Sequence, residues 1–79
     1  MKVMKSVDIL LDTIDKVKAF TTLANEKDFD IDLTSGRYIV DAKSIMGIFS
    51  LDLSKPVTCE VEDPNAQQFF EEIKSYIAE

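Results

Sequence analysis

Hydrophobic and polar residues alternate along three segments of the chain, and a fourth segment, residues 38–40, is a run of residues that favour strands. A period of two is typical of a strand that buries one of its faces. The segments are residues 3–9, 28–33, 38–40 and 57–61. The turn Thr34-Ser35-Gly36-Arg37 joins the second segment to the third, so we expect these two strands to form a hairpin. In the last segment, the face that we expect to be buried carries Val57, Cys59 and Val61.

The spacing of other apolar residues predicts a first helix. It begins at Ile14, after a cap that either Asp12 or Thr13 can provide, and it ends near Asn25. The face expected to be buried consists of Ile14, Val17, Phe20 or Thr21, and Ala24.

Two more helices are expected in the second half of the chain. Ser44 precedes a short helix-compatible run over residues 45–51. Asp63 and Pro64 suit the cap and the first position of the last helix, since proline has no amide to leave unpaired there. The apolar stripe of this last helix consists of Phe69, Phe70, Ile73, Tyr76 and Ile77.

The resulting order of elements is βαββαβα. The link between residues 28–33 and 38–40 is too short for the crossover that parallel strands need, so the sheet is expected to be antiparallel. We therefore predict a single domain over residues 1–79 of the α+β class, with a four-stranded sheet covered on one face by three helices. The predicted core consists of Val17, Phe20, Phe29, Ile31, Leu33, Val57, Cys59, Val61, Phe69, Ile73 and Ile77.

Composition and charge narrow the range of functions. The 79 residues allow one modest core, and 46% hydrophobic against 30% charged residues is typical of a folded protein. A net charge of −6 without a basic run argues against binding to nucleic acid or to an anionic membrane. The chain has one cysteine, and its first residues lack the apolar run of a signal peptide or a membrane span. We therefore expect a cytoplasmic monomer.

Candidate catalytic and metal-binding groups are few. The chain contains no histidine, and Cys59 is expected to be a buried apolar residue because it shares a face with two valines. Aspartates at positions 28, 30 and 32 imitate the opening of a calcium loop, but Leu33 replaces the required glycine and the final glutamate is missing. We expect these aspartates to guard the solvent face of a strand against edge pairing. The sequence indicates no enzyme, no cofactor and no metal site.

The central segment of the chain carries a specific motif. It reads Val40-Asp41-Ala42-Lys43-Ser44-Ile45-Met46-Gly47-Ile48-Phe49-Ser50-Leu51. It resembles the stretch of HPr proteins, the phosphocarriers of the bacterial sugar phosphotransferase system, that carries a regulatory serine in a Lys-Ser-Ile-Met-Gly core. The predicted order of elements is also that of the HPr family. The resemblance therefore spans nearly the whole chain and implies the open-faced sandwich of that family.

The resemblance also marks two residues that this chain has replaced. In HPr proteins the phosphoryl-accepting histidine stands just before the first helix, and an arginine that steadies the phosphate follows two residues later. By spacing, Thr13 lies near the histidine position and Asp15 near the arginine position. A threonine ester passes phosphate on far less readily than a phosphoramidate, and a carboxylate repels phosphate. We interpret Thr13 as a helix cap and Asp15 as a first-turn charge that favours the helix dipole.

Ser44 and the apolar residues after it are the other candidate site. By resemblance, Ser44 is a target of an HPr-type kinase, and an ordinary helix cap is the alternative. A short helix cannot bury all five apolar residues of the segment 45–51. In the family the apolar residues after this serine contact partner proteins, which makes Ile45, Met46 and Phe49 candidates for partner binding. Sealing of the sheet edge is the alternative.

Two classes of function stay open. The first is a regulatory or adaptor protein without histidine phosphocarrier activity, similar to the catabolite-repression branch of the family, which also lacks the histidine and keeps the serine. The replacement of the family's arginine by Asp15 argues against a corepressor role, because in the family that arginine contacts a repressor-type transcription factor. The second is a non-phosphorylatable binding partner of transport components or a structural interaction module. Expected partners are accordingly transport-system components, an HPr-type kinase or a transcriptional regulator.

Overall fold

The structure, a computed structural model, describes residues 3–78 of the chain. Its elements are, in chain order, β1 (Met4–Ile9), α1 (Ile14–Asn25), β2 (Ile31–Ser35), β3 (Tyr38–Asp41), α2 (Ile45–Phe49), β4 (Val57–Glu62), α3 (Ala66–Glu72) and a 3₁₀ helix (Lys74–Tyr76). The βαββαβα order predicted from the sequence is confirmed.

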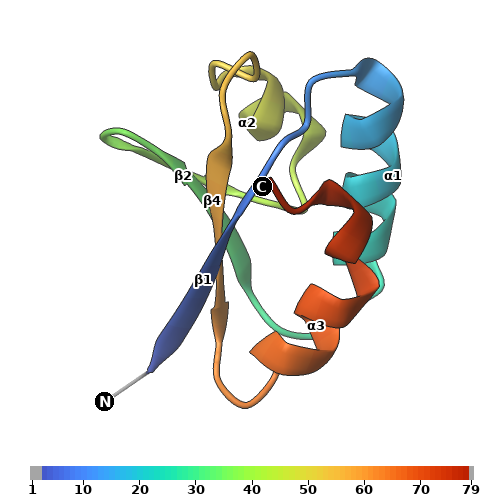
Figure 1. The fold of residues 1–79 in the computed structure, drawn as a ribbon, viewed down its shortest axis with the longest axis vertical. Helices are drawn as coiled ribbons and strands as arrows, with labels where there is room; N and C mark the ends of the chain where they lie inside the picture. Colours follow the sequence, from blue (N-terminus) through green and yellow to red (C-terminus); the bar gives the residue numbers. More distant parts are fainter. Residues whose placement is uncertain (1–2, 79) are drawn as a thin grey trace.

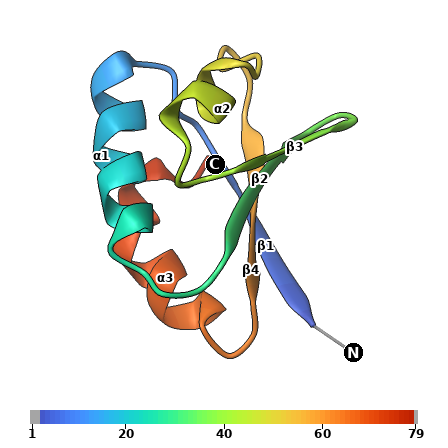
Figure 2. The same cartoon turned by 180° about the vertical axis from the view of Figure 1, so that it is seen from behind.

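The four strands form one antiparallel sheet in the spatial order β1-β4-β2-β3. Gly36, at φ 60°, supplies the left-handed backbone that the tight turn between β2 and β3 requires. The helices α1, α2 and α3 all lie on one side of the sheet, and the tip of the β2–β3 hairpin projects away from them (Figures 1 and 2). The predicted α+β class, the antiparallel pairing and the one-sided helical layer are therefore confirmed.

The core lies between the sheet and the helices. Alternate residues of β4 and β2 point into it, because a strand turns successive side chains to opposite faces. All predicted core residues are buried except Phe29 and Ile77, which are half-buried and pack against the core. The predicted core omitted buried apolar residues in short elements and connections: Ile9, Leu11, Ala42, Ile48, Leu51 and Ala66.

Two details of the first half differ from the prediction. Ile14 is 61% exposed instead of buried, since the first turn of α1 extends past the packed residues and Val17 is the first buried one. The prediction that Asp28, Asp30 and Asp32 share the solvent face of one strand was wrong. Strand β2 begins only at Ile31, so the first two aspartates precede it. Phe29 reaches Phe69 from the connection after α1, with ring centroids 6.2 Å apart in an edge-to-face contact. This contact explains the apparent alternation before the strand.

The last helix is shorter than predicted at its start. The backbone N–H of Asp63 donates to the carbonyl of Val3 at 2.9 Å, so the chain still follows the sheet where the cap was expected. The Asp63–Pro64 peptide bond is cis, and α3 begins at Ala66 with Asn65 before it. The assignment of Asp63 as cap and Pro64 as first helical residue was therefore wrong.

The end of the chain also departs from a continuous helix. After the 3₁₀ helix, Ile77 forms a bridge with Ile9 of β1. Two backbone hydrogen bonds flank this bridge, from Leu10 to the carbonyl of Tyr76 and from Ala78 to the carbonyl of Asp8. The C-terminal residues therefore add a short pairing to the outer edge of β1 instead of a last helical turn.

The single cysteine provides a test of the core. Burial raises the pKa of the Cys59 thiol to about 12 from an ordinary value of 9.0, and the charges of Asp32 and Glu60 add to the shift. Because the folded state favours the neutral thiol, its stabilising effect is complete below about pH 9 and is lost as the pH rises towards 12. We expect slow alkylation of the native protein at pH 8 and rapid alkylation in urea, measured by mass spectrometry. Equal rates would contradict the burial of Cys59.

Candidate functional site

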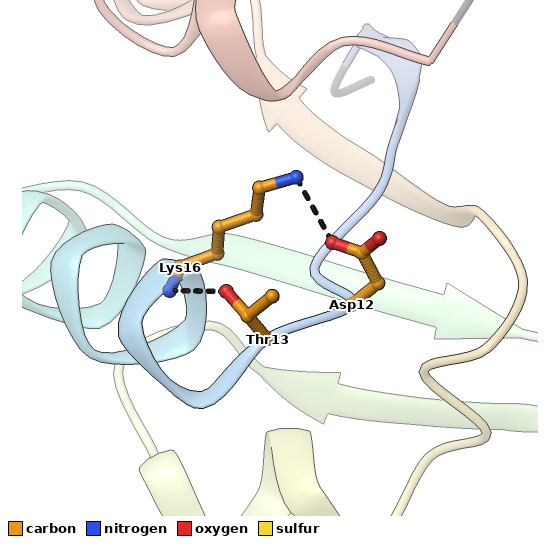
Figure 3. Close-up of polar contacts among 3 residues, drawn as sticks. All are labelled: Asp12, Thr13 and Lys16. Carbon is orange, nitrogen blue, oxygen red and sulfur yellow. Dashed lines mark hydrogen bonds and ion pairs between the residues drawn. The ribbon is translucent and has the colours of Figure 1, made fainter.

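The connection from β1 to α1 carries Thr13, which the sequence predicts by spacing to lie near the position of a phosphate-accepting residue. Thr13 has extended backbone with φ −130° and ψ 155°, and its Oγ1 accepts a hydrogen bond from the N–H of Lys16 at 3.1 Å. Figure 3 shows this hydroxyl turned toward the first turn of the helix. The carbonyl of Thr13 also accepts the N–H of Val17 at 3.1 Å. Thr13 is thus the N-cap of α1, one of the two caps that the sequence allowed.

The charges around this cap do not form a phosphate cradle. The ammonium of Lys16 donates to Oδ1 of Asp12 at 2.9 Å, one helical turn away (Figure 3). This hydrogen bond lowers the pKa of Asp12 below its ordinary value. Asp15 is exposed in the first turn, where the helix dipole favours a negative charge. The start of α1 therefore holds two carboxylates, and its nearest ammonium is already bonded to one of them.

Replacement of Thr13 by alanine tests the cap. We expect the free energy of unfolding to fall by about 1 kcal/mol, because the N–H of Lys16 loses its acceptor. Thr13→Ser keeps the hydroxyl and should remain close to the wild-type value. Urea unfolding followed by circular dichroism measures both variants. Identical midpoints for Thr13→Ala and the wild type would show that the cap contributes nothing.

Ser44 occupies the equivalent place at the start of α2. Its Oγ accepts a hydrogen bond from the N–H of Gly47 at 3.1 Å, and its own N–H donates to the carbonyl of Asp41 at 3.0 Å. A β-carbon at Gly47 would lie 3.3 Å from both Ser44 Oγ and Val40 Cβ, so glycine allows the close approach of α2 to β3. Ser44 itself is exposed. Ser44 is thus a helix cap with an accessible hydroxyl.

The five apolar residues after Ser44 divide between the core and the surface. Ile48 is fully buried and Leu51 nearly so. Met46 is 77% exposed and Phe49 43% exposed, while Ile45 is half-buried. Because α2 ends at Phe49, two residues earlier than predicted, Leu51 reaches the core from the following turn. Met46 is too exposed to seal the sheet edge, so that alternative does not account for it.

A shallow groove runs between α1 and the start of α2. It is lined by Lys18, Thr21, Thr22, Asn25, Glu26, Lys43 and Ile45. The side chain of Asn25 donates to the carbonyl of Lys43 at 3.1 Å, and the ammonium of Lys43 donates to the carbonyl of Lys27 at 2.9 Å. These bonds hold the residue before Ser44 near the C-terminal end of α1, whereas Thr13 stands at the other end. The groove was not predicted, since only the packing of two helices distant in sequence creates it.

Three features of the described residues bear on their chemistry: possible metal ligands, apolar helices and the cysteine thiol. Within residues 3–78, no group of three or more His, Cys, Asp or Glu side chains is placed to hold a metal ion. In the same span, every helix is too short or too polar to cross a membrane. The raised pKa of Cys59 keeps its thiol neutral and unsuited to nucleophilic attack. What remains is a surface of exposed apolar residues beside a polar groove.

Comparison with protein families gives one match that covers most of the chain. The family model described as "PTS HPr component phosphorylation site" matches residues 16–79. Thr13 and Asp15 lie just before the matched residues. No curated protein sequence matches the chain. The match therefore includes the segment around Ser44 and excludes Thr13 and Asp15.

Solved structures agree with this match. The chain is similar to the crystal structure of a phosphocarrier protein HPr from Bacillus anthracis strain Ames, with a TM-score of 0.72 and 28% identity over 98% of both chains. It also shares the fold of HPr-C-His from Thermoanaerobacter tengcongensis, with a TM-score of 0.75 and 24% identity over 95% of this chain and 90% of the other. On its family match and its fold together, the chain belongs to the HPr family of the phosphotransferase system.

Proposed function

We propose that this protein is a regulatory or adaptor member of the HPr family that binds partner proteins without carrying phosphate on histidine. The observation that carries the proposal is the residue at the position of the family's acceptor. By spacing, Thr13 lies near that position; its Oγ1 accepts the N–H of Lys16, and none of the 79 residues is a histidine. Phosphoryl transfer through an imidazole therefore has no acceptor in this chain.

The charges near Thr13 support the same proposal. A phosphoryl group at the start of α1 would meet the carboxylates of Asp12 and Asp15, where HPr proteins have a guanidinium. The ammonium of Lys16 is bonded to Asp12 and offers only partial compensation. A phosphothreonine would also be a poor donor for onward transfer, because an ester is more stable than a phosphoramidate.

The proposed contact surface consists of Ile45, Met46 and Phe49 next to Ser44. Met46 is flexible and polarisable, which suits contacts with partners of differing shape. Ile45 also lines the groove between α1 and α2, where Lys18, Lys43 and Glu26 add charged groups at the border of this surface. We propose cytoplasmic transport components, an HPr-type kinase or a transcriptional regulator as partners. The lone buried cysteine, which needs no oxidising compartment, is in keeping with the cytoplasm.

A pulldown from native cytoplasm tests the contact surface. The bait is the wild-type protein, compared with Met46→Asp, in which a charge replaces an exposed apolar side chain. Val3→Asp is the matched control, because Val3 is 58% exposed and lies on the N-terminal side of β1, far along the chain from α2. We expect partners that bind wild type and Val3→Asp but not Met46→Asp. Transport enzymes among them favour the adaptor role, and a repressor favours the regulatory one. Equal recovery by all three baits would refute the surface.

Phosphorylation of Ser44 is proposed as the regulation of this surface. The exposed Oγ accepts only the N–H of Gly47, and phosphate oxygens can take over that bond. New negative charge next to Met46 should then weaken acidic partners and leave the fold intact. Mass spectrometry after incubation with an HPr-type kinase and ATP is expected to find phosphate on wild type and none on Ser44→Ala. If an ordinary HPr is modified in the same reaction and wild type is not, Ser44 serves only as a helix cap.

A further inference from the structure

Lys43, the residue before Ser44, is held by three hydrogen bonds. Its N–H donates to Oδ1 of Asp41 at 2.9 Å, its carbonyl accepts from Nδ2 of Asn25 at 3.1 Å, and its ammonium donates to the carbonyl of Lys27 at 2.9 Å. Asp41 ends β3, whereas Asn25 is the last residue of α1 and Lys27 follows it closely. The N–H, the carbonyl and the ammonium of Lys43 are therefore all bonded within the protein. We call Asn25, Lys27 and Lys43 the latch.

The ammonium of Lys43 also suits the end of α1 electrostatically. The last turn of α1 contains no basic residue of its own. The carbonyl groups at a helix C-terminus carry the negative end of the helix dipole and lack partners within the helix. Lys43 brings a positive charge to this end from a distant part of the chain, and it is half-buried, so water and salt screen the contact less. We therefore expect the contact to persist in solution.

The latch is attached to a support that is itself fixed. Nδ2 of Asn25 also donates to the carbonyl of Thr21 at 2.9 Å, which sets the orientation of this side chain. The ammonium of Lys27 donates to Oε1 of Glu72 on α3 at 2.6 Å, and the two side chains are only 17% and 33% exposed. Both helices lie on the same side of the sheet (Figure 2). The latch thus connects the residue before Ser44 to α1 and, through α1, to α3.

The start of α2 depends on such polar contacts. With five residues, α2 is too short to be stable by itself. Its middle is anchored by Ile48, which is fully buried. Ser44, at its start, is exposed and has no apolar side chain that could enter the core. The position of the Ser44 hydroxyl therefore depends on the backbone before it, which the bonds of Lys43 hold in place.

We infer that Lys43 and Asn25 are positioning residues that hold the Ser44 hydroxyl where a kinase can phosphorylate it, an inference that rests on the proposed regulation at Ser44. In that reaction Oγ of Ser44 forms a bond to the γ-phosphorus of ATP, the bond from this phosphorus to ADP breaks, and the hydroxyl proton passes to a base of the kinase. The attacking oxygen must stand close to the phosphorus and in line with the leaving group, so a small displacement lowers the rate. Lys43 acts through Ser44 and not on the kinase, because its ammonium is bonded to α1.

The kinetics of Ser44 phosphorylation test the latch. Lys43→Met removes the ammonium, and Asn25→Leu removes the amide at similar volume. Each variant should lower kcat with an HPr-type kinase and ATP about fivefold, the usual effect of one hydrogen bond. KM should stay close to the wild-type value, because Ile48 still anchors α2 in the core. Lys43→Arg keeps a donor for the Lys27 carbonyl and should restore kcat. Lys74→Met is the matched control, since it removes the same charge from an exposed residue of the 3₁₀ helix.

The variants separate positioning from direct recognition by the kinase. If Lys43→Met raised KM while Asn25→Leu behaved as wild type, the kinase would contact Lys43 directly and the inference would be overturned. Unchanged kcat in both variants would overturn it as well. A wild-type protein that stays unmodified while an ordinary HPr is phosphorylated would instead contradict the proposed regulation at Ser44.

Amide exchange of Gly47 tests the latch without a kinase. The N–H of Gly47 donates to Oγ of Ser44, so its exchange reports how firmly the start of α2 is held. We expect about fivefold faster exchange in Lys43→Met and Asn25→Leu than in the wild type and Lys74→Met, measured by nuclear magnetic resonance. Equal exchange in all four proteins would refute the latch, whatever the kinase does.

Discussion

The double variant Thr13→His/Asp15→Arg is expected to accept phosphate from phosphoenolpyruvate through the general phosphotransferase of sugar transport, whereas the wild-type protein accepts none. The variant supplies an imidazole nitrogen where Thr13 caps α1 and a guanidinium where Asp15 repels the phosphoryl group. The expected change is from no labelling to stoichiometric, acid-labile and alkali-stable labelling, measured with radioactive phosphoenolpyruvate. We expect this to be the largest functional effect, because under the proposed function it introduces a reaction that the wild-type protein does not perform.

Two controls separate the acceptor from the docking surface. Thr13→His alone keeps Asp15 beside the new imidazole and should label weakly. Adding Met46→Asp to the double variant should abolish labelling, since the acceptor is present but the proposed contact surface is charged. If the double variant stays unlabelled while an ordinary HPr is labelled, the transfer surface has been lost together with the histidine. Labelling of the wild-type protein would disprove the proposed function.

Removal of the Phe20 side chain is expected to have the largest effect on stability. Phe20 is fully buried, and its ring meets Phe69 and Tyr76 edge to face, with centroids 6.1 Å and 6.0 Å apart. Truncation of such a residue to alanine costs roughly 3–5 kcal/mol, because the cavity cannot fully close. A chain of 79 residues is stable by only about 4–12 kcal/mol in total. We therefore expect Phe20→Ala to be largely unfolded near 37 °C.

Urea and thermal unfolding measure this effect. Phe20→Leu retains most of the apolar volume and should lose clearly less stability than Phe20→Ala. Met46→Ala serves as the exposed control and should unfold within about 0.5 kcal/mol of wild type. If Phe20→Ala lost no more than Met46→Ala, the aromatic contacts with α3 and the 3₁₀ helix would have no part in stability.

The sequence predicted the elements whose signals are local. The alternation of β4 and the helical spacing of α1 both match the structure, because each depends on which face of one element is buried. Thr13 and Ser44 were each among the predicted possible caps for the same reason, since a cap acts on an amide only three residues away. The motif around Ser44 then pointed to the family that the comparison confirmed.

Features that depend on tertiary contacts could not be predicted from the sequence. Phe29 fitted the alternating pattern of a strand, although it lies in the connection before β2 and packs on Phe69. Pro64 was predicted to be the first residue of the last helix, although the backbone N–H of Asp63 before it is still hydrogen-bonded to the carbonyl of Val3. At the candidate site, the groove along Lys18 and Lys43 exists only because α1 and α2 meet, so no local pattern announces it. To predict such features, one must know which residue from a distant part of the chain makes the contact.

The pairing of β1 with β4 also governs how quickly this chain can fold. These strands are roughly fifty residues apart, and the bridge from Ile9 to Ile77 spans still more of the chain. A chain must lose the entropy of closing such loops before the contacts repay it, so folding should be slower than in a helical bundle of equal size. The β2–β3 hairpin and α1 are held by hydrogen bonds between residues that are close along the chain. They are the natural candidates for early structure, with β1 joining the sheet last.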